Sequence, residues 1–338
     1  MVTIKDVAKM AGVSIATVSR TLAEPEKVSE KTREKVMKAV NSSGYVTNTL
    51  ARNFRRRRSN TVVVLVPDIA NPFFSNIIQG IEKVASRHQY RILLGDTQGD
   101  EATERAYADL VSQRQADGVI CLGRNIPFPY RKGRKTVDPD WPPFAMACEY
   151  HGDIPVPTVC IDNVAAACDA VTHLTELGHR EIGFINGPAD SPLCEDRLLG
   201  YRQAMKNAGV KSNAQWVLHG DFSLASGYYC MQQFLQGKRS ISAVFCANDE
   251  MAIGAMRACR DAGLSLPQDM SIVGFDDIAF AEYTHPRLSS VHQPRNRIGE
   301  QVMTLMLSML AGNLPASPRV VLPHELVVRE SSVAHLSA

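Results

Sequence analysis

The chain has 338 residues, more than one hydrophobic core usually serves, which indicates two or three domains. Hydrophobic residues make up 45% and charged residues 21%, as in globular proteins, and the longest apolar run, residues 62–66, is too short to cross a membrane. Residues 1–60 hold 13 Lys and Arg against 5 Asp and Glu, a net charge of +8, whereas the rest has a net charge of −6. A basic head that suits a polyanion therefore precedes an acidic body.

The N-terminus and the cysteines indicate an intracellular protein. The first six residues include Lys5 and Asp6 and have no apolar stretch, unlike a secretory signal. The eight cysteines contain no C-x-x-C pair, so we expect small buried residues and neither disulfides nor a zinc site. We expect a cytoplasmic protein, acting at the nucleoid, with no membrane contact, no metal and no cofactor.

The basic head carries the signals of three short helices. Thr3, Ser14 and Ser29 are the expected N-caps, and Gly12 and Gly44 are the glycines that end the first and the third helix. Two short helices joined by a glycine turn and followed by a third predict a helix-turn-helix DNA-binding domain over residues 1–46. A plain helical bundle with a solvated polar face is the alternative.

The second helix is expected to have two faces. Val18 and Leu22 are spaced to point into the head, which leaves the opposite face free to enter a major groove. Arginine suits guanine and small apolar groups suit thymine methyls, so the candidate base-reading residues are Ile15, Ala16, Ser19 and Arg20. Hydroxyls near helix N-termini suit phosphates, and these residues are Thr3, Ser14, Thr17, Ser29 and Thr32.

Residues 47–59 are expected to form a hinge helix or linker. Four consecutive arginines at 55–58 repel one another, and DNA phosphates would relieve that repulsion. We therefore predict a segment that is disordered in the free protein and helical on DNA. Phe54 is a candidate wedge in a minor-groove step. The alternative is a solvated linker with Phe54 packed on the next domain.

From residue 61 onward, short β-branched runs alternate with helical segments, which indicates parallel sheets flanked by helices. Two such series predict a two-lobed core over residues 60–338. Its first lobe spans about 60–161 plus 292–322, and its second about 162–291 plus 323–338. The predicted strands are 61–67, 90–94, 118–122, 144–147, 158–161, 181–186, 216–219, 243–246 and 271–275. The predicted helices are 74–89, 101–115, 164–177, 197–208, 223–235, 249–262 and 297–310.

Polar and aromatic side chains cluster after these strands, where ligands of parallel sheets bind. In a cleft between the lobes they would suit a polyhydroxylated ring. The candidate effector contacts are Phe73, Phe74, Glu149, Arg197, Phe222, Asn248 and Asp276, with Arg197 and Asp276 foremost. Residues at such positions often only cap the next helix, and Asp249 is expected to do so.

Several motifs resemble the lactose-repressor/galactose-repressor family of bacterial transcription regulators, and the similarity runs along nearly the whole chain. In the head they are TIKDVA at 3–8, GVS at 12–14, TVSR at 17–20 and VSEKTR at 28–33. In the body they are PDIANPFF at 67–74, LGHR at 177–180, PQDMS at 267–271 and GFD at 274–276.

The resemblance implies a repressor that binds a palindromic operator and a small effector. It also implies a hinge helix that opens the minor groove, a periplasmic-binding-protein-like core, and a dimer or tetramer. The C-terminus has no leucine heptad of the tetramerising kind, so we expect a homodimer. By position, base reading falls on Ile15, Ala16 and Arg20. Hinge and minor-groove contacts fall on Asn48, Leu50, Ala51, Phe54 and Arg55. Effector contacts fall on Phe74, Arg197, Phe222, Asn248 and Asp276.

Within the family, segments 125–128, 157–163 and 192–201 are most similar to the cytidine-responsive branch. That branch implies a nucleoside effector and, at the promoter, the cyclic-AMP receptor protein as a partner. A sugar or a purine is the alternative, although Ser191 stands where a purine-responsive member has an arginine. Thr47 replaces a common proline and Phe54 the usual leucine wedge, so we expect a looser hinge and a modest operator affinity.

Two other functions would use the same core. Asp276, Asp277 and Glu149 could be the paired carboxylates of a glycoside or nucleoside hydrolase, but the sequence lacks glycine-rich nucleotide, P-loop, zinc-protease and nucleophile-elbow motifs. A transport-linked binding protein would have a signal peptide and no basic head. We therefore expect a ligand-responsive repressor and not an enzyme.

Overall fold

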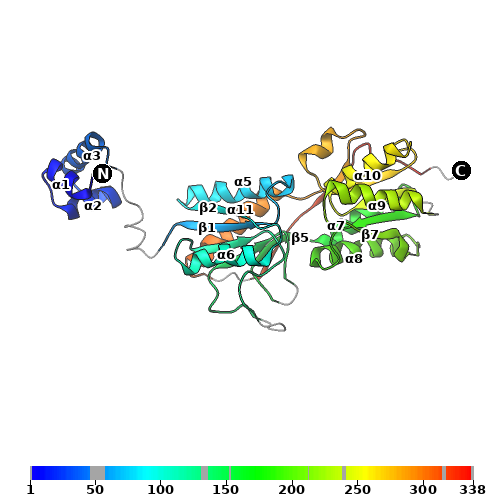
Figure 1. The fold of residues 1–338 in the computed structure, drawn as a ribbon, viewed down its shortest axis with the longest axis horizontal. Coiled ribbons are helices and arrows are strands. Elements are labelled where there is room, and N and C mark those ends of the chain that lie inside the picture. Colours follow the sequence, from blue (N-terminus) through cyan, green and yellow to red (C-terminus); the bar gives the residue numbers. More distant parts are fainter. Residues whose placement is uncertain are drawn as a thin grey trace. The chain divides into compact units, whose positions relative to one another are not determined.

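The computed structural model describes residues 2–45, 58–130, 136–151, 154–211, 213–237, 241–313 and 317–335. The chain divides into two compact units, Met1–Ser59 and Asn60–Ala338, and each is described by itself (Figure 1). The predicted hinge and minor-groove contacts lie outside the described residues; they are Asn48, Leu50, Ala51, Phe54 and Arg55.

The first unit is a small helical domain over its described residues 2–45. Val7, Val18 and Val36 come from different helices and are buried together in its core. Gly12 and Gly44 end the first and third helices in the left-handed conformation, which glycine adopts without a Cβ clash, so both predicted helix stops are confirmed. The helices are α1 (Ile4–Ala11), α2 (Ile15–Ala23) and α3 (Glu30–Ser43), with a 3-10 turn η1 (Pro25–Lys27) after α2.

The second unit holds two six-stranded sheets among its described residues, and each sheet is the centre of one lobe. Lobe 1 has the strand order β11-β5-β4-β3-β1-β2, and lobe 2 has the order β12-β10-β9-β8-β6-β7. The strands of lobe 1 are β1 (Thr61–Val66), β2 (Arg91–Asp96), β3 (Gly118–Cys121), β4 (Phe144–Ala147), β5 (Thr158–Ile161) and β11 (Arg319–Leu322). Those of lobe 2 are β6 (Ile182–Asn186), β7 (Val217–His219), β8 (Ala243–Cys246), β9 (Ser271–Asp276), β10 (Ser289–His292) and β12 (Glu325–Val327).

Helices cover both faces of the lobe 1 sheet. Helices α5 (Pro72–Arg87) and α11 (Arg295–Leu310) lie together on one face, and α6 (Glu101–Ser112) lies on the other (Figure 1). Strand β1 shows the reason, because its side chains alternate between the two faces and all five of its valines and leucines are buried. Val62, Val64 and Val66 join the core on the α5 side, whereas Val63 and Leu65 join the core on the α6 side.

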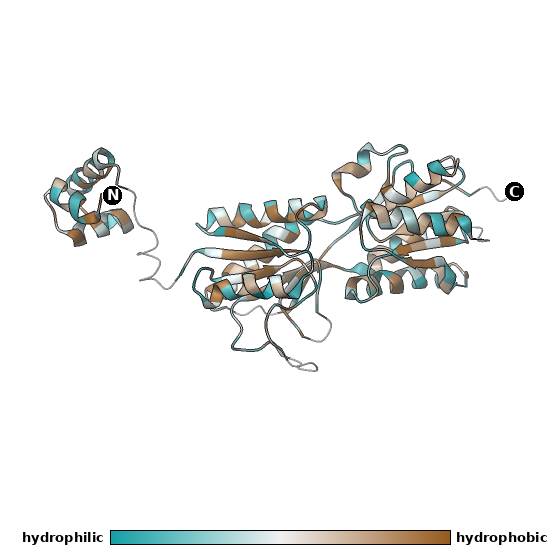
Figure 2. Ribbon diagram, viewed as in Figure 1, coloured by the Kyte–Doolittle hydropathy of each residue, from teal (hydrophilic) through white to brown (hydrophobic). Residues whose placement is uncertain are grey.

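Lobe 2 repeats this arrangement with two helix pairs. Helix α7 (Asn163–Glu176) packs against α8 (Pro192–Asn207), and α9 (Leu224–Gln236) packs against α10 (Asp249–Asp261). Hydrophobic residues concentrate on the strands and on the helix faces that meet them (Figure 2). The short 3-10 turns are η2 (Ala214–Trp216) and η3 (Ala279–Tyr283).

In the described part of the chain, three segments pass between the lobes. One follows β5, one follows β10, and one joins β11 to β12. As a result, helix α11 packs on the strands of lobe 1 although it follows β10 of lobe 2. Strands β10, β11 and β12 were not predicted, because they are short. Strand β10 also begins with two serines, Ser289 and Ser290, which are completely buried in the structure.

The predicted fold class is confirmed, and the other predicted strands and helices are found with small shifts of their ends. One helix differs more, because α8 begins at Pro192 and not near Arg197. Proline fits the first helical position, where its missing N–H would have no partner. All eight cysteines are described; seven are buried and Cys168 is half-buried. In the described part of the chain, no helix is long and apolar enough to cross a membrane.

The contact between α5 and α11 depends on glycine. A Cβ added to Gly80 would lie 2.2 Å from the carbonyl oxygen of Asn296, which belongs to α11. We expect Gly80→Ala to lower the free energy of unfolding by about 1–3 kcal/mol, because overpacking outweighs the roughly 1 kcal/mol by which alanine favours a helix. Urea unfolding checks this, with Ser86→Ala on the exposed side of α5 as the control, expected within about 0.5 kcal/mol of the wild type. A stabilised Gly80→Ala protein would contradict the packing.

Candidate functional site

The exposed face of α2 carries the predicted base-reading residues. Ile15 is 45% exposed, Ala16 and Arg20 are exposed, and Ser19 is half-buried. Val18, on the opposite side of the helix, is completely buried in the head. The helix therefore presents a small apolar and cationic surface, with no acidic residue along its own length.

The predicted phosphate-binding hydroxyls lie at the N-termini of the three head helices. The Thr3 hydroxyl oxygen accepts a hydrogen bond from the amide of Asp6, which forms the capping bond. The Asp6 carboxylate accepts in turn from the Thr3 hydroxyl and from the Thr3 amide, and these two bonds hold the pKa of Asp6 below its usual range. Ser14 accepts from the amide of Thr17 at 3.1 Å, so the predicted caps at Thr3 and Ser14 are confirmed. Ser29 makes no such capping bond; its hydroxyl lies 3.0 Å from that of Thr32 instead.

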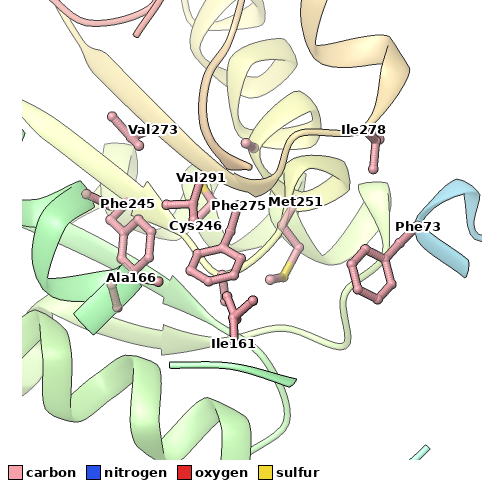
Figure 3. Packing of buried hydrophobic residues seen from close by; sticks show 14 of the residues in the cluster. Phe73, Ile161, Ala166, Phe245, Cys246, Met251, Val273, Phe275, Ile278 and Val291 are labelled. Carbon is pink, nitrogen blue, oxygen red and sulfur yellow. The ribbon is translucent and has the colours of Figure 1, made fainter. Parts of the chain in front are cut away.

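The core brings a buried cation to the ends of its strands. Arg197 of α8 is 4% exposed, and its guanidinium lies 3.7 Å from the centre of the Phe275 ring. Its Nε donates to Asn163 Oδ1 at 3.0 Å, and its Nη1 donates to the carbonyl of Ala247. Phe275 lies in the hydrophobic core among Phe245, Met251 and Ile161, while Phe73 approaches the same cluster from α5 (Figure 3).

Asp276 ends β9 beside this cation in a strained conformation. Its φ is 102°, a value that favours glycine, and it is 6% exposed. Gln293, in the passage from lobe 2 to lobe 1, donates to Asp276 Oδ1 at 2.7 Å. Burial raises the pKa of Asp276 to about 6, against the opposing charge of Arg197.

Phe222 is half-buried and is held in the left-handed region, with a φ of 71°. The side chain of Asn248 donates to the Phe222 carbonyl at 2.9 Å and accepts from the Met251 amide at 3.0 Å. Gly187 leaves room for the Phe222 ring, because a Cβ at Gly187 would lie 2.3 Å from it. Asn248 thus caps α10 and holds the backbone of Phe222 with the same side-chain amide.

Glu149 follows β4, directly after Cys148, which also has a positive φ of 69°. Ser191 of lobe 2 donates to the Glu149 carboxyl at 3.5 and 3.4 Å. Burial raises the pKa of Glu149 to about 7, although Arg197 and Arg124 oppose the shift. A carboxyl group that changes charge near neutrality therefore lies close to Arg197.

Asp249 is not the simple helix cap that the sequence suggested, and that prediction was wrong. Asn248 is the N-cap of α10, and Asp249 is completely buried. Its Oδ2 accepts from the Ile278 amide at 2.7 Å, and its Oδ1 accepts from the Ser290 hydroxyl at 2.6 Å. Asp249 therefore joins α10 to β10 and to the segment after β9.

In the structure, Arg197 lies close enough to both Asp276 and Glu149 for its positive charge to favour ionisation of either carboxyl group. Phe73 is 8% exposed and belongs mainly to the core, and Phe74 stacks edge-on against it with ring centres 5.2 Å apart. Three residues that were not among the predicted effector contacts bind two of those that were. Asn163 and Phe275 contact Arg197, and Gln293 contacts Asp276. Asn163 and Phe275 lie at predicted strand ends and could have been found, but Gln293 follows the unpredicted β10. No group of three or more potential metal ligands occurs within the described ranges.

Comparison with known proteins agrees with this architecture. Residues 3–48 match a family described as bacterial regulatory proteins, lacI family, and residues 171–332 match a periplasmic binding protein-like domain. The chain is 42% identical over 332 residues to the HTH-type transcriptional repressor CytR of Escherichia coli (strain K12), which covers 98% of this chain and 96% of that protein.

Two solved structures share the fold. The lac repressor dimer bound to operator and the anti-inducer ONPF is 26% identical, with a TM-score of 0.87 over 98% of this chain and 99% of that one. The complex of the transcriptional regulator CelR with cellobiose is 31% identical, with a TM-score of 0.72 over 98% of this chain and all of that one.

The structural role of Asp249 can be separated from its charge. Burial raises the pKa of Asp249 well above its usual range, so its neutral form is favoured. We expect Asp249→Ala to lower the free energy of unfolding by about 2–4 kcal/mol, because the Ile278 amide and the Ser290 hydroxyl lose their acceptor. Asp249→Asn resembles the neutral acid and should lose about 1 kcal/mol or less. Urea unfolding at pH 7 measures both, and equal losses would show that a neutral side chain does not suffice.

Proposed function

The chain belongs to the lacI family of bacterial regulatory proteins and is a DNA-binding transcriptional repressor, and from this premise we propose that a nucleoside such as cytidine controls its affinity for a palindromic operator. The observation that carries the proposal is the 42% identity to the repressor CytR over 98% of the chain. The resemblance of segments 125–128, 157–163 and 192–201 to the cytidine-responsive branch supports it. The relatives are transcriptional regulators, and we propose no catalytic step.

The first half of the function is operator recognition by α2. In this proposal Arg20 donates two hydrogen bonds to a guanine, and Ile15 and Ala16 contact thymine methyls. The exposure of all three side chains on α2 supports this assignment. Ser19 adds a hydroxyl at the edge of the same face. The hydroxyls of Thr3, Ser14, Thr17, Ser29 and Thr32 bind phosphates and set the register. The hinge contacts at Asn48, Leu50, Ala51, Phe54 and Arg55 complete the interface in the minor groove.

The second half is effector binding between the lobes. Arg197 and Asp276 offer a buried donor and a buried acceptor for ribose hydroxyls, and Glu149 adds a second carboxyl group. Phe74 and Phe222 supply aromatic faces for the base, with Phe73 behind them and Asn248 holding Phe222. Because coupling is reciprocal, an effector that weakens operator binding is itself bound more weakly by the operator complex.

The repressor acts as a homodimer in this proposal, as the lac repressor does in its operator complex. A dimer places two copies of α2 in successive major grooves of a palindrome. Large apolar side chains that a partner could cover include Phe280, 58% exposed, and Tyr283, 84% exposed, both on η3. At the promoter, the cyclic-AMP receptor protein is the partner that the cytidine-responsive branch implies.

A nucleoside panel tests the effector. We expect cytidine, at 100 times its dissociation constant, to stabilise the full chain by about 2.7 kcal/mol, whereas cytosine, ribose and cellobiose do not. Thermal unfolding measures the shift. Arg197→Ala should lose it, and the exposed Arg105→Ala should keep it. A shift with a sugar alone, such as the cellobiose bound by the related CelR, would replace the nucleoside by a sugar effector.

Operator reading has a separate test. In vitro selection with the full chain supplies the operator, and Arg20→Ala should weaken its binding by about 1–3 kcal/mol while relaxing the sequence preference at one position of each half-site. The exposed Lys38→Ala on α3 serves as a surface-charge control that leaves the preference intact. Fluorescence anisotropy at fixed salt measures both. An unchanged preference after Arg20→Ala would remove this residue from base reading.

A further inference from the structure

Among the described residues, four of the contacts that join the lobes are made between polar side chains near the proposed effector site. Each pairs a residue of lobe 1 with one of lobe 2. The pairs are Asn71 with Glu250, Glu149 with Ser191, Arg124 with Asp190, and Tyr150 with Asp196. These contacts are made by side chains, so they break when the lobes separate.

Two of the four contacts involve a glutamate that accepts a hydrogen bond from the opposite lobe, and each lobe supplies one of these two glutamates. Glu250 of lobe 2 accepts a hydrogen bond from Asn71 Nδ2 of lobe 1 at 2.9 Å. Glu149 of lobe 1 accepts from the hydroxyl of Ser191 of lobe 2. Each lobe thus supplies one half-buried acid that accepts a hydrogen bond from the other lobe. Within the described residues, neither acid forms an ion pair within 4.0 Å.

The charges around these two acids differ. Glu250 faces the carboxylates of Asp68, in lobe 1, and Asp276, at the end of β9, and both disfavour a negative charge on it. Burial is the largest influence on Glu149 and disfavours its charge, as does Asp190, whereas Arg197, Arg124 and the hydrogen bond from Ser191 favour the charge. The thiols near Glu149 are those of Cys121, Cys148 and Cys194.

We propose that Glu250 and Glu149 form a proton-dependent latch between the lobes, in which each carboxyl group favours the closed arrangement when it is protonated and favours opening when it ionises. The neutral acid keeps an oxygen that accepts from Asn71 or Ser191, and it removes the repulsion between Glu250 and its two carboxylate neighbours. Opening returns both acids to water, where the charged form is well solvated.

The direction of the pH effect follows from the closed arrangement. Burial raises the pKa of Glu250, and that of Glu149, to about 7, from an ordinary value of 4.5. Opening brings both values back toward 4.5 and releases protons, so the closed arrangement loses stability as the pH rises from 4.5 to 7 and is weakest above 7. Between pH 6 and pH 8 the closing equilibrium should fall about tenfold for each acid.

Hydrogen exchange of the full chain, without ligand or DNA, tests the latch. Mass spectrometry follows peptides over residues 68–75 and 188–197 at pH 6.0 and 8.0, with labelling times scaled for the intrinsic pH dependence of exchange. We expect protection in the wild type to fall at least tenfold from pH 6.0 to 8.0. Glu250→Gln or Glu149→Gln should reduce this fall, and the double variant should show less than a threefold change.

Matched variants separate the latch from folding. Glu101→Gln replaces an exposed acid of α6 and should keep the wild-type pH profile, and a peptide over β1 should stay protected in every variant. Asn71→Asp keeps the side-chain oxygen that accepts from the Phe73 amide and caps α5. It also places a carboxylate opposite Glu250, so it should lower protection at pH 8.0. Wild-type protection that is independent of pH, or a double variant that keeps the wild-type profile, would overturn the proposal. Because no nucleoside is used, failure of the effector panel leaves this test intact.

Discussion

The buried charge of Arg197 is the interaction on which the core depends. Removing an unpaired guanidinium from water costs several kcal/mol, so its surroundings must compensate it. The Phe275 ring, the Asn163 side chain and the Ala247 carbonyl do so directly, and they come from β9, the start of α7 and the segment after β8. The cation can be buried only when these three segments lie in register. The stability of the fold and the geometry of the proposed effector site therefore rest on the same contacts.

Three residues at or next to the candidate site have a strained backbone conformation. Cys148, Phe222 and Asp276 all have positive φ values, and each such residue costs on the order of 1–3 kcal/mol. Specific hydrogen bonds hold two of them, from Asn248 to Phe222 and from Gln293 to Asp276. These bonds keep the Phe222 ring and the Asp276 carboxyl in place before a ligand arrives, which reduces the entropy lost on binding.

The segments that pass between the lobes connect the candidate site to helices elsewhere in the core. Gln293 contacts Asp276 and lies two residues before α11 begins. Helix α11 packs tightly on α5, and α5 begins next to Asn71 and Phe73. A displacement at Asp276 would therefore reach elements of both lobes, as the proposed coupling between effector and operator requires. Glu250 contacts Asn71 at the start of α5, so the proposed latch would act on the same elements.

Features whose signals lie within a few residues could be predicted from the amino-acid sequence. The caps at Thr3 and Ser14, the glycine stops, the alternation of strands and helices, and the family motifs could all be read directly, because hydroxyl caps and backbone conformation act over one helical turn. The rule that ligands meet the carboxyl ends of parallel strands also placed Arg197 and Asp276 in one region.

The roles of neighbouring residues with similar signals depend on contacts that form in the folded protein. Asn248 and Asp249 both follow β8, yet one caps α10 and positions Phe222, while the other is buried and bound to Ile278 and Ser290. Likewise, β10 is a strand because β9 and β12 pair with it, although its own residues are largely polar. Burial and hydrogen bonding depend on partners far away in the chain, and the free energy of a buried carboxyl or guanidinium is set by those partners and not by its sequence neighbours.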